Sequence, residues 1–589
     1  MLFRKFGVLR TIVIGSVALL LVSLLVFGYG SLHNRNVVRT GLHGLLTHNP
    51  VEGIVAPGMK DVGDVALKYP WQMALMTKNQ SSETVIQKQL LPRMIAANVY
   101  YMWCGKGRWF EFKHYLSVLS ATKALPTDKI VFYYEHLPVM DKMYYNLWYG
   151  DIKHDLPFFI ETPMEKWQLK YCEKGVSNQE KLNVILRILN QEGGIFITEN
   201  TWLFAVSPKR RLLNLELAYN LDIGEGYVMM RHGLINTSSN MDSVMYKQDN
   251  NIKHHQCSRV HHVYYTRDLG LCTVVKDGRY ERIWPMNIWD LDDPFGRLVR
   301  RLFYDTEEIR KAKPSYDTLV PNIGHMIWIG GKNMDFVFYL SVLSLLYVAK
   351  VDVVYIHGDL EPAGENWRVL KENPKTKDRV LFNRRAPPYH IYQGIIEPWY
   401  KALMSDIIRV DLMIKYGGIY TDTDAIWVKP LTYEDRGYDA VASFDWVDWS
   451  WPYPDSVNFG ISYGKKNVPF WQIFRESMRQ LHNDHHGFTG VMMPYKLLEK
   501  YPHLLRIDRH LQVICYYSKC HPIFVDDYHN MTKDHTNTHS LDNWQRDINA
   551  FHWTYPNPPE YANISALMKS AGMFADVGKF VLRKAGIIL

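Results

Sequence analysis

Two carboxylates in one short segment are the residues of this sequence best suited to chemistry. Asp422 and Asp424 stand two apart in the run GGIYTDTDAIWVKP, which begins at Gly417. Side chains two apart on a strand share one face, where two carboxylates can hold Mg²⁺ or Mn²⁺ while phosphate oxygens complete the coordination. A cation held there would neutralise a leaving diphosphate. Short acidic pairs are common in solvated turns, so the pair alone is weak support for a metal site. The preceding glycine turn and the apolar neighbours strengthen this prediction.

The segment before the acidic pair is expected to form an amphipathic helix that ends near Gly417. Its apolar residues recur at steps of three and four: Trp399, Leu403, Ile407, Val410 and Ile414. Asp406 and Arg409 project together from a neighbouring face. In isolation they would form an ordinary ion pair three residues apart. Their place just ahead of the acidic pair makes them candidates for the same site.

An internal repeat divides the chain. Tyr-Leu-Ser-Val-Leu-Ser occurs at 115–120 and again at 339–344, and Gly-Gly-Ile recurs at the same spacing, at 193–195 and 417–419. Strands alternate with helices between these anchors, which is typical of an α/β fold with a mainly parallel sheet. We therefore expect two tandem α/β domains, at 91–310 and 318–563.

The first copy lacks the chemical groups of the second. At the positions of Asp406, Arg409, Asp422, Asp424 and His325 it has, in that order, Leu182, Ile185, Thr198, Asn200 and Tyr100. Trp103 and the glycines are kept. Glu199 is a weak candidate for residual metal binding, because on a strand it would point to the opposite face. We expect a degenerate, non-catalytic domain.

Three motifs of the second copy resemble glycosyltransferase family 32, the DXD-containing sugar transferases related to the clostridial glucosylating toxins. They occur in family order within residues 318–560: VPNIGHMIWIGG at 320–331, SDIIR at 405–409 and GGIYTDTD at 417–424. The resemblance implies a GT-A fold, which is Rossmann-like, and a nucleotide-sugar donor. It also implies a divalent metal ion, Mn²⁺ or Mg²⁺, and retention of the anomeric configuration.

The same resemblance implies roles for residues that would bind the donor. Trp328 would stack on the nucleotide base, and His325 lies in the same motif. Asp406 and Arg409 would hold the donor sugar, and Asp422 would contact the ribose or the sugar. An indole offers a flat stacking surface and a guanidinium can clamp a phosphate or a hydroxyl, so these roles are chemically reasonable.

The metal ligands that the resemblance implies are Asp424 and Asp422. The segment Ala-Phe-His-Trp at 550–553 resembles the family's C-terminal histidine segment, so His552 would complete the metal or phosphate site. Asn458 and the pair at 489–490 fall where the family has residues lining the pocket. The histidines at 482, 485 and 486 are more typical of a solvated loop.

The N-terminal region predicts a membrane anchor. No charged residue occurs from Thr11 to Gly30, a length that can cross a bilayer as one helix, and Arg4, Lys5 and Arg10 precede it. We expect a cytosolic tail at 1–10, a transmembrane signal-anchor at 11–30 and a stem at 31–90. This organisation predicts a single-pass type II protein of the Golgi membrane with a lumenal catalytic part.

Cysteines and glycosylation sequences agree with a lumenal location. All six cysteines follow the apolar segment, and their pairing is left open, although Cys515 and Cys520 are close enough for a local disulfide. Asn79, Asn236, Asn530 and Asn563 each begin an N-x-S/T triplet. The tail at 564–589 has an apolar helical pattern and is expected to pack on the catalytic domain, with a membrane-surface role as the alternative.

Composition excludes several classes of protein. The chain of 589 residues is 47% hydrophobic, which excludes bulk disorder, and its formal charge of +8 includes no polybasic block, so nucleic acid is not an expected partner. The sequence predicts transfer of a hexose or N-acetylhexosamine, from a UDP-sugar rather than GDP-mannose, to a glycan or glycolipid acceptor. The second-ranked hypothesis is a non-catalytic carbohydrate-binding or scaffolding protein. The third is a phosphohydrolase with an aspartyl-phosphate intermediate.

Overall fold

The computed structural model describes most of the chain beyond the N-terminal region. The described residues are 98–125, 127–139, 147–205, 217–222, 225–234, 254–256, 263–266, 271–274, 283–392, 394–445, 456–479, 487–516, 519–524, 541–555 and 563–589. The predicted tail, membrane segment and stem all lie outside them. Within these ranges, no helix is both long and apolar enough to span a membrane.

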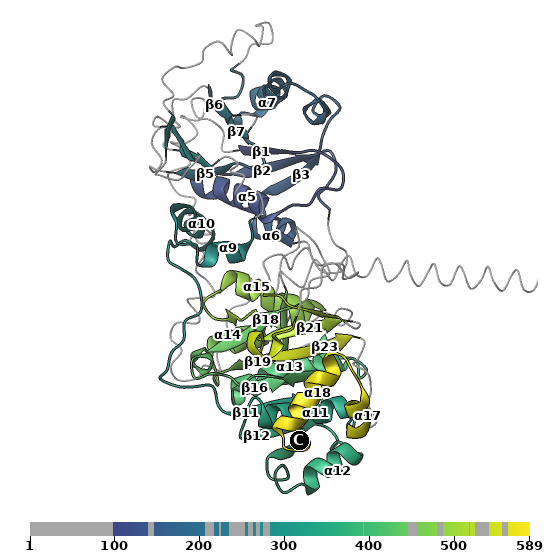
Figure 1. The fold of residues 1–589 in the computed structure, drawn as a ribbon. Helices are drawn as coiled ribbons and strands as arrows, with labels where there is room; N and C mark the ends of the chain where they lie inside the picture. The colour runs from purple at the N-terminus through teal and green to yellow at the C-terminus, as the bar shows by residue number, and fades with distance from the viewer. Residues whose placement is uncertain are drawn as a thin grey trace, which may run out of the picture. The chain divides into compact units, whose positions relative to one another are not determined.

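The second half is built on a seven-stranded sheet (Figure 1). Its strands, in spatial order, are β13 (Val380–Arg384), β12 (Val353–Gly358), β11 (Ile323–Ile327), β16 (Gly418–Thr421), β19 (Val457–Gly464), β18 (Ala440–Phe444) and β20 (Arg506–Ile507). The first four strands are mutually parallel, β19 is antiparallel to both its neighbours, and β20 is parallel to β18. The predicted α/β class with a mainly parallel sheet is confirmed for this half.

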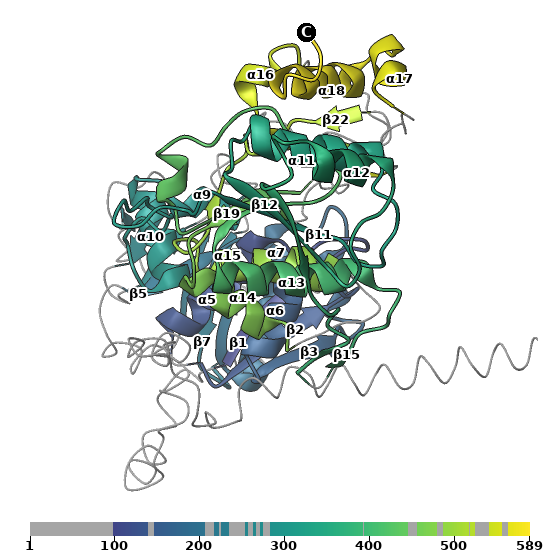
Figure 2. The same ribbon diagram turned by 90° about the horizontal axis from the view of Figure 1, so that it is seen from below.

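Helices cover this sheet and complete two apolar cores. The helices that follow β11 and precede β16 are α11 (Phe336–Tyr347) and α13 (Lys401–Lys415). Figure 2 shows the two on opposite sides of the strands. The remaining helices of this half are α12 (Glu365–Glu372), α14 (Pro469–Ser477), α15 (Met493–Lys500), α16 (Trp544–Asp547), α17 (Ile564–Lys569) and α18 (Met573–Lys584), with short helical turns η6 (Asp435–Gly437) and η7 (Phe488–Met492).

A smaller four-stranded sheet brings the C-terminal region to the end of β16. Its order is β17 (Ala425–Trp427), β23 (Ala550–Tyr555), β21 (Gln512–Tyr516) and β22 (Lys519–His521). The local disulfide Cys515–Cys520 joins β21 to β22, one of the pairings that the sequence left open. A separate hairpin, β14 (His390–Ile391) with β15 (Gly394–Ile395), precedes α13.

The first half contains a six-stranded sheet with the same order. It runs β3 (Phe159–Pro163), β2 (Lys129–Tyr134), β1 (Asn98–Trp103), β4 (Gly194–Ile197), β7 (Glu225–Met230) and β6 (Leu217–Asp222). A second sheet runs β5 (Trp202–Ala205), β10 (Leu271–Val274), β9 (Val263–Thr266) and β8 (His254–Gln256). The helices here are α5 (Phe112–Ala124), α6 (Leu147–Asp155), η3 (Leu169–Cys172), α7 (Asn178–Glu192), α9 (Pro285–Trp289) and α10 (Pro294–Tyr304).

The repeated serine motif makes the same contact in both halves. Ser117 Oγ on α5 donates to the carbonyl of Thr201 at 2.6 Å, and Ser341 Oγ on α11 donates to the carbonyl of Ala425 at 2.5 Å. Each bond ties a helix to the residues that lead out of the strand after the glycine pair. The sequence repeat therefore coincides with two sheets of one strand order and with one shared tertiary hydrogen bond.

Two sequence predictions about helices are wrong in part. Trp399 was expected on the apolar face of α13, but the helix begins at Lys401 and Trp399 is 70% exposed. Pro398 lies in a turn in which Tyr400 N donates to the carbonyl of Glu397 at 2.9 Å, and this turn directs Trp399 away from the core. The C-terminal pattern is two helices rather than one, because Gly572 has a positive φ of 106° that ends the helical path, although α18 does pack against α11.

Candidate active site

Asp422 and Asp424 lie in a turn, not on a strand. The strand β16 ends at Thr421 and β17 begins at Ala425, so the expected shared strand face is wrong. Ala425 N donates to the carbonyl of Asp422 at 3.2 Å, which closes the turn, and Asp422 N donates to the carbonyl of Gly460 at 2.7 Å. The chain has to turn here because β16 and β17 belong to different sheets.

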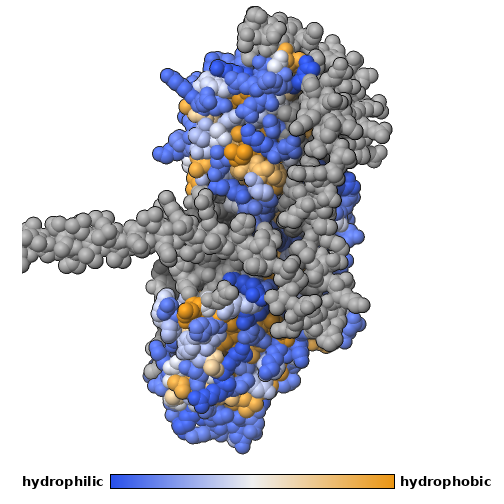
Figure 3. Space-filling view, turned by 180° about the vertical axis from the view of Figure 1, so that it is seen from behind, coloured by the Kyte–Doolittle hydropathy of each residue, from blue (hydrophilic) through white to orange (hydrophobic). Residues whose placement is uncertain are grey.

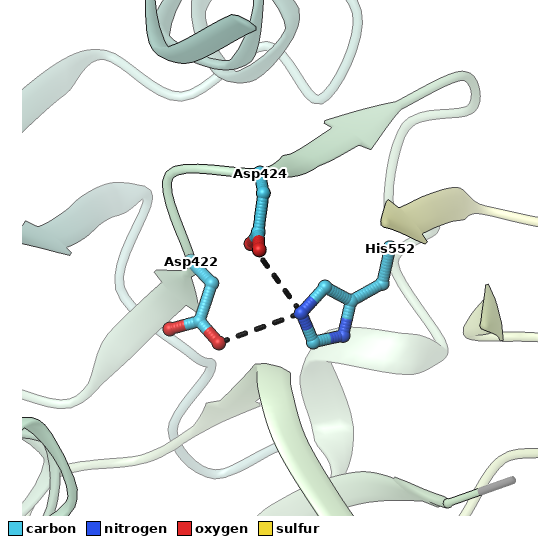
Figure 4. Close-up of side chains that lie close together, drawn as sticks. All are labelled: Asp422, Asp424 and His552. Atoms are coloured by element: carbon cyan, nitrogen blue, oxygen red, sulfur yellow. Dashed lines mark ion pairs between the residues drawn. The ribbon is translucent and has the colours of Figure 1, made fainter. Parts of the chain in front are cut away.

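The turn nevertheless brings both carboxylates to one histidine. His552 Nε2 lies 3.5 Å from Asp422 Oδ2 and 3.4 Å from Asp424 Oδ1, and one ligand atom from each of the three residues lies within 4.8 Å of the others. Figure 4 shows the two carboxylates turned towards the imidazole ring. The His552 side chain is 5% exposed, whereas those of Asp422 and Asp424 are 28% and 30% exposed. The cluster is therefore closed on the histidine side and open to solvent on the carboxylate side.

The strand pairing of β23 explains the position of His552. The strand is antiparallel to β17, with His552 opposite Ala425, and Trp553 N donates to the carbonyl of Asp424 at 3.2 Å. The imidazole packs directly on Gly460 of β19, where an added Cβ would lie 2.0 Å from His552 Cε1. Only glycine at this position leaves room for the ring.

Arg409 fixes the other side of Asp422. Its guanidinium lies 4.2 Å from the centre of the Tyr420 ring, with Nη2 3.3 Å from Asp422 Oδ1 and Nη1 3.4 Å from Asp406 Oδ1. The Tyr420 hydroxyl donates to the same Asp422 Oδ1 at 2.5 Å. The two oxygens of Asp422 therefore have separate partners: Oδ1 faces Arg409 and Tyr420, and Oδ2 faces His552.

Burial and charge act against each other in this group. Burial raises the pKa of Asp422, although Arg409 and His552 oppose that shift. Burial would lower the pKa of His552, but Asp424 and Asp422 outweigh it and the pKa is raised. Burial also disfavours the charge of Arg409, yet Tyr420, Asp422 and Asp406 raise its pKa. The histidine cation that these shifts favour replaces, in part, the positive charge that a metal ion would supply.

Asp406 is buried beneath this group. It is 3% exposed and lies against Gly490, where an added Cβ would come within 2.3 Å of Asp406 Oδ2. Thr489 beside it is also buried. Gly490 thus lies against Asp406. Asn458 has a different role: its Oδ1 accepts a hydrogen bond from Gly460 N at 2.8 Å and so supports the strand under His552.

His325 lies in the middle of β11, and Trp328 directly follows the last residue of that strand. Trp328 is half-buried, with its ring centre 5.0 Å from that of Phe338. His325 is buried, and its ring bonds to the carbonyl of Gly417 at 3.0 Å and to His357 Nε2 at 3.0 Å. His325 therefore supports the glycine turn that leads to Asp422. Contacts of either residue with a nucleotide stay predictions.

The donor atoms of the cluster fit a divalent cation. Asp422 and Asp424 supply hard oxygens, and the imidazole of His552 supplies a nitrogen. A mixed set of two carboxylates and one imidazole suits Mn²⁺, whereas Mg²⁺ prefers oxygen alone. No other group of three or more such side chains is close enough to hold a metal ion in the part of the chain that the structure covers.

Three residues of this site were not identified from the sequence. Tyr420 stands two before Asp422, so strand periodicity alone would place it on the same face and was a usable signal. Gly460 and His357 gave no such signal, because their roles depend on which strands become neighbours in the sheet.

The corresponding positions of the first half have different contacts. Thr198 Oγ1 is 2.7 Å from Thr201 Oγ1 and 3.3 Å from the carbonyl of Gly226, so it is part of the scaffold. Glu199 forms an ion pair of 2.5 Å with Arg108, whose guanidinium lies 4.1 Å from the centre of the Trp103 ring. The carboxylate that the sequence left as a weak metal candidate is thus paired with an arginine.

Comparison with known proteins supports a transferase. Residues 306–443 match the family model described as "Glycosyltransferase sugar-binding region containing DXD motif". This range contains Trp328, Asp406, Arg409, Asp422 and Asp424, but not His552. No curated protein matches the sequence. The match identifies a glycosyltransferase-type region in the second half.

Solved glycosyltransferases are similar at low identity. A galactosyltransferase LgtC in complex with donor and acceptor sugar analogs is 16% identical, with 45% of this chain and 96% of that chain covered and a TM-score of 0.29. The glycosyltransferase GlyE of Streptococcus pneumoniae is 12% identical, with 45% and 62% covered and a TM-score of 0.27. PaToxG glycosyltransferase is 18% identical, with 32% and 72% covered and a TM-score of 0.23. At these values no residue role or substrate is carried over.

Proposed function

We propose that the second half of this chain is a metal-dependent, retaining glycosyltransferase of family 32. It moves a hexose or N-acetylhexosamine from a nucleotide sugar, a UDP-sugar, to a glycan or glycolipid acceptor. The observation that carries the proposal is the meeting of Asp422, Asp424 and His552 at one solvent-open cluster, next to a buried arginine. Asp422 and Asp424 lie within the residues that match a sugar-binding region of DXD type.

Asp424, Asp422 and His552 would hold Mn²⁺, which would take up the charge of the departing diphosphate. The bond between the anomeric carbon and the diphosphate oxygen breaks, a bond from that carbon to an acceptor oxygen forms, and the proton of the acceptor hydroxyl passes to the departing diphosphate. Asp406 would contact the donor sugar and Trp328 the base. We assign Arg409 and Tyr420 to positioning Asp422, because both contact its Oδ1.

We propose that the first half is a degenerate tandem copy without activity. Its sheet has the same strand order as the second, and Thr198 and Glu199, which pairs with Arg108, stand at the positions equivalent to Asp422 and Thr423. The alternative for the whole chain is a non-catalytic carbohydrate-binding protein. The intact cluster of the second half favours the enzyme.

We also propose a type II Golgi membrane protein with a lumenal catalytic part. The support for this location is the uncharged segment 11–30 in the sequence, together with two disulfides, Cys104–Cys172 and Cys515–Cys520, which are typical of an oxidising compartment.

Donor turnover tests the proposed activity. The purified part that follows the apolar segment is incubated with a panel of UDP- and GDP-sugars, first with Mn²⁺ and then with EDTA, and release of the nucleoside diphosphate is measured. We expect turnover of at least one UDP-sugar with Mn²⁺ and none with EDTA. Absence of turnover for every donor, or turnover that EDTA does not affect, would contradict the proposal.

A further inference from the structure

Four large apolar side chains near the start of α13 face the solvent. Their exposed fractions are 45% for Tyr389, 41% for Tyr392, 59% for Ile395 and 70% for Trp399. On the face drawn in Figure 3, apolar residues occur in small groups within a mainly hydrophilic surface. Three exposed aromatic side chains and one exposed isoleucine within residues 389–399 are a feature that calls for a function. We name these four residues the aromatic patch.

Buried neighbours in the sequence anchor the segment that carries the aromatic patch. Ile391, Ile396 and Tyr400 alternate with it in the sequence and are buried in the core beneath α13. The Trp399 ring stacks on that of Tyr400, with centres 5.0 Å apart and planes 20° apart. An indole supported in this way presents its other face to solvent with little loss of side-chain entropy on binding.

Tyr392 is fixed separately on α14. Its hydroxyl donates to Glu476 Oε2 at 3.0 Å, and the Arg479 guanidinium lies 3.9 Å from the centre of its ring. Tyr392, which follows β14, therefore holds this part of the hairpin segment against the region of α14.

The topology places the aromatic patch at the edge of the sheet where the proposed donor site lies. Because α13 leads back to the start of β16, its N-terminal end is at the edge where β11 and β16 end. Lys401 Nζ, two residues after Trp399, donates to the carbonyl of Ile329 at 3.0 Å, directly after Trp328. Ligands of open α/β sheets bind at this edge.

The chemistry of the aromatic patch fits a carbohydrate. Glu397 and His390 are exposed among the apolar side chains. Flat rings beside a carboxylate and an imidazole match a sugar, whose apolar C–H face can lie on an indole while its hydroxyls form hydrogen bonds. A bilayer fits less well, since a carboxylate between Ile395 and Trp399 would be driven into the headgroup region of an anionic membrane.

We propose that the aromatic patch is the docking site for the acceptor glycan, with Trp399 as its central stacking residue. This inference rests on the proposed transferase function, because it assigns the acceptor side of the same site. It names the class of acceptor as a carbohydrate chain long enough to reach from Trp399 to the acidic turn.

The test compares acceptor and donor constants in Trp399→Ala, Trp399→Phe and a matched control. Tyr433 is 65% exposed and stacks on Tyr316, and it lies near the start of β11, where Val320 N donates to the carbonyl of Arg436. It is thus an equally exposed aromatic residue at the opposite edge. We expect Trp399→Ala to raise the acceptor KM about tenfold, Trp399→Phe to raise it less, and Tyr433→Ala to leave it unchanged.

Donor measurements separate this proposal from the proposed function. The Kd for UDP with Mn²⁺ and the hydrolysis of the donor by water should be the same in Trp399→Ala as in the wild type. If the wild type turns over no donor, the transferase proposal fails, and the aromatic patch is then tested by binding of the protein to a printed array of defined oligosaccharides.

Each outcome of these measurements either supports or overturns the proposed docking site. A raised acceptor KM supports the acceptor site, and glycan-array binding by the wild type that Trp399→Ala loses supports a glycan-docking site at the aromatic patch. An unchanged acceptor KM would overturn the proposal, as would, when transfer is absent, a wild type that binds no oligosaccharide on the array. Binding to phosphatidylserine vesicles and the oligomeric state of Trp399→Ala are measured in parallel. A change in either of these alone would also overturn it.

Discussion

At the scale of single residues, Asp422 is the centre of the site because its two oxygens have different partners. One oxygen accepts from Tyr420 and pairs with Arg409, and the other faces His552. A carboxylate held at both oxygens cannot rotate without losing one set of contacts. The surrounding residues thus fix the direction in which Asp422 would meet a cation.

Replacing Tyr420 by phenylalanine removes one of these contacts and keeps the ring under Arg409. We expect transfer to fall about 10- to 100-fold and the affinity for Mn²⁺ to weaken, since an outer partner that orients a metal ligand has effects of this size. The measurements are steady-state kinetics and a Mn²⁺ titration. Tyr438→Phe is the control, because it removes a hydroxyl that accepts a hydrogen bond from Arg506, away from the site. Equal kinetics in both variants would contradict the role of Tyr420.

Gly460→Ala tests the packing that positions His552. The new Cβ would lie 2.0 Å from the imidazole, so the ring has to move. We expect unfolding to become easier by about 1–3 kcal/mol, as for other overpacked cores, and Mn²⁺ binding to weaken. Urea unfolding and a Mn²⁺ titration measure the two effects.

The double variant Gly460→Ala, His552→Ala is the control for this clash. Without the ring there is no collision, so the stability cost of adding alanine should largely disappear in the His552→Ala background. A cost that is the same in both backgrounds would show that the alanine acts elsewhere.

The carboxylates of this site could be found from the sequence, but the packing around them could not. Spacing and the glycine turn identify Asp422 and Asp424, and a family resemblance was needed to propose His552, which is distant in sequence. Gly460 became recognisable only through the register of β19 with β16, because a close contact depends on which backbones meet.

At the scale of elements, a histidine pair supports the glycine turn ahead of β16. Because Gly417 O can only accept, His325 Nε2 donates to it, and His325 Nδ1 then accepts from His357 Nε2. The first half uses phenol rings instead: the Tyr100 hydroxyl donates to Gly193 O, and Tyr133 stacks on Tyr100.

Burial of the histidine pair predicts a pH dependence of stability. Burial lowers the pKa of His325 to about 4 and that of His357 to about 3. An unfolded histidine titrates near about 6.5. Between about pH 6.5 and pH 4 the unfolded state therefore binds protons that the folded state excludes, and the free energy of unfolding should fall as the pH falls.

The variant His325→Tyr, His357→Tyr copies the pair of the first half and removes both titrating groups. Its unfolding free energy, measured by urea at a series of pH values, should fall less steeply than that of the wild type below about pH 6.5. Identical slopes in the two proteins would show that these histidines do not govern the acid sensitivity.

Element order was predictable, and the departures from it are local. Strand β2 and the helices that end at each glycine pair follow directly from apolar periodicity. The positions of Trp399 and of the acidic turn did not follow from periodicity. A proline turn moved Trp399 off the face of the helix, and a change of sheet interrupted the strand at Asp422. Periodicity detects the face of an element but not where the chain leaves it.

At the scale of the whole molecule, two halves of one strand order differ in their side chains at the corresponding turn. The second carries the Asp–Asp–His cluster, whereas the first has Thr198 in scaffold bonds and Glu199 paired with Arg108. Comparison of the repeats predicted the loss of the acidic pair. It could not predict the arginine pair, because a missing group does not reveal which other side chain takes its place.

Matched substitutions in the two halves test which one is active. Asp424→Ala and Asn200→Ala change equivalent positions of the repeat. We expect Asp424→Ala to reduce transfer by at least about 10²-fold, the usual effect of removing one group that stabilises the developing charge, and Asn200→Ala to leave it unchanged. Substantial transfer by Asp424→Ala would mean that the first half is active.

Calorimetric titration of UDP into the protein tests the central claim most directly, because it needs no knowledge of the donor sugar or the acceptor. With Mn²⁺ present, the wild type should bind UDP at one site, and both EDTA and the substitution Asp424→Asn should abolish that binding while the protein stays folded. Binding of UDP that neither EDTA nor Asp424→Asn weakens, or no binding by the wild type with Mn²⁺, would contradict a metal-dependent nucleotide-sugar site at Asp422, Asp424 and His552.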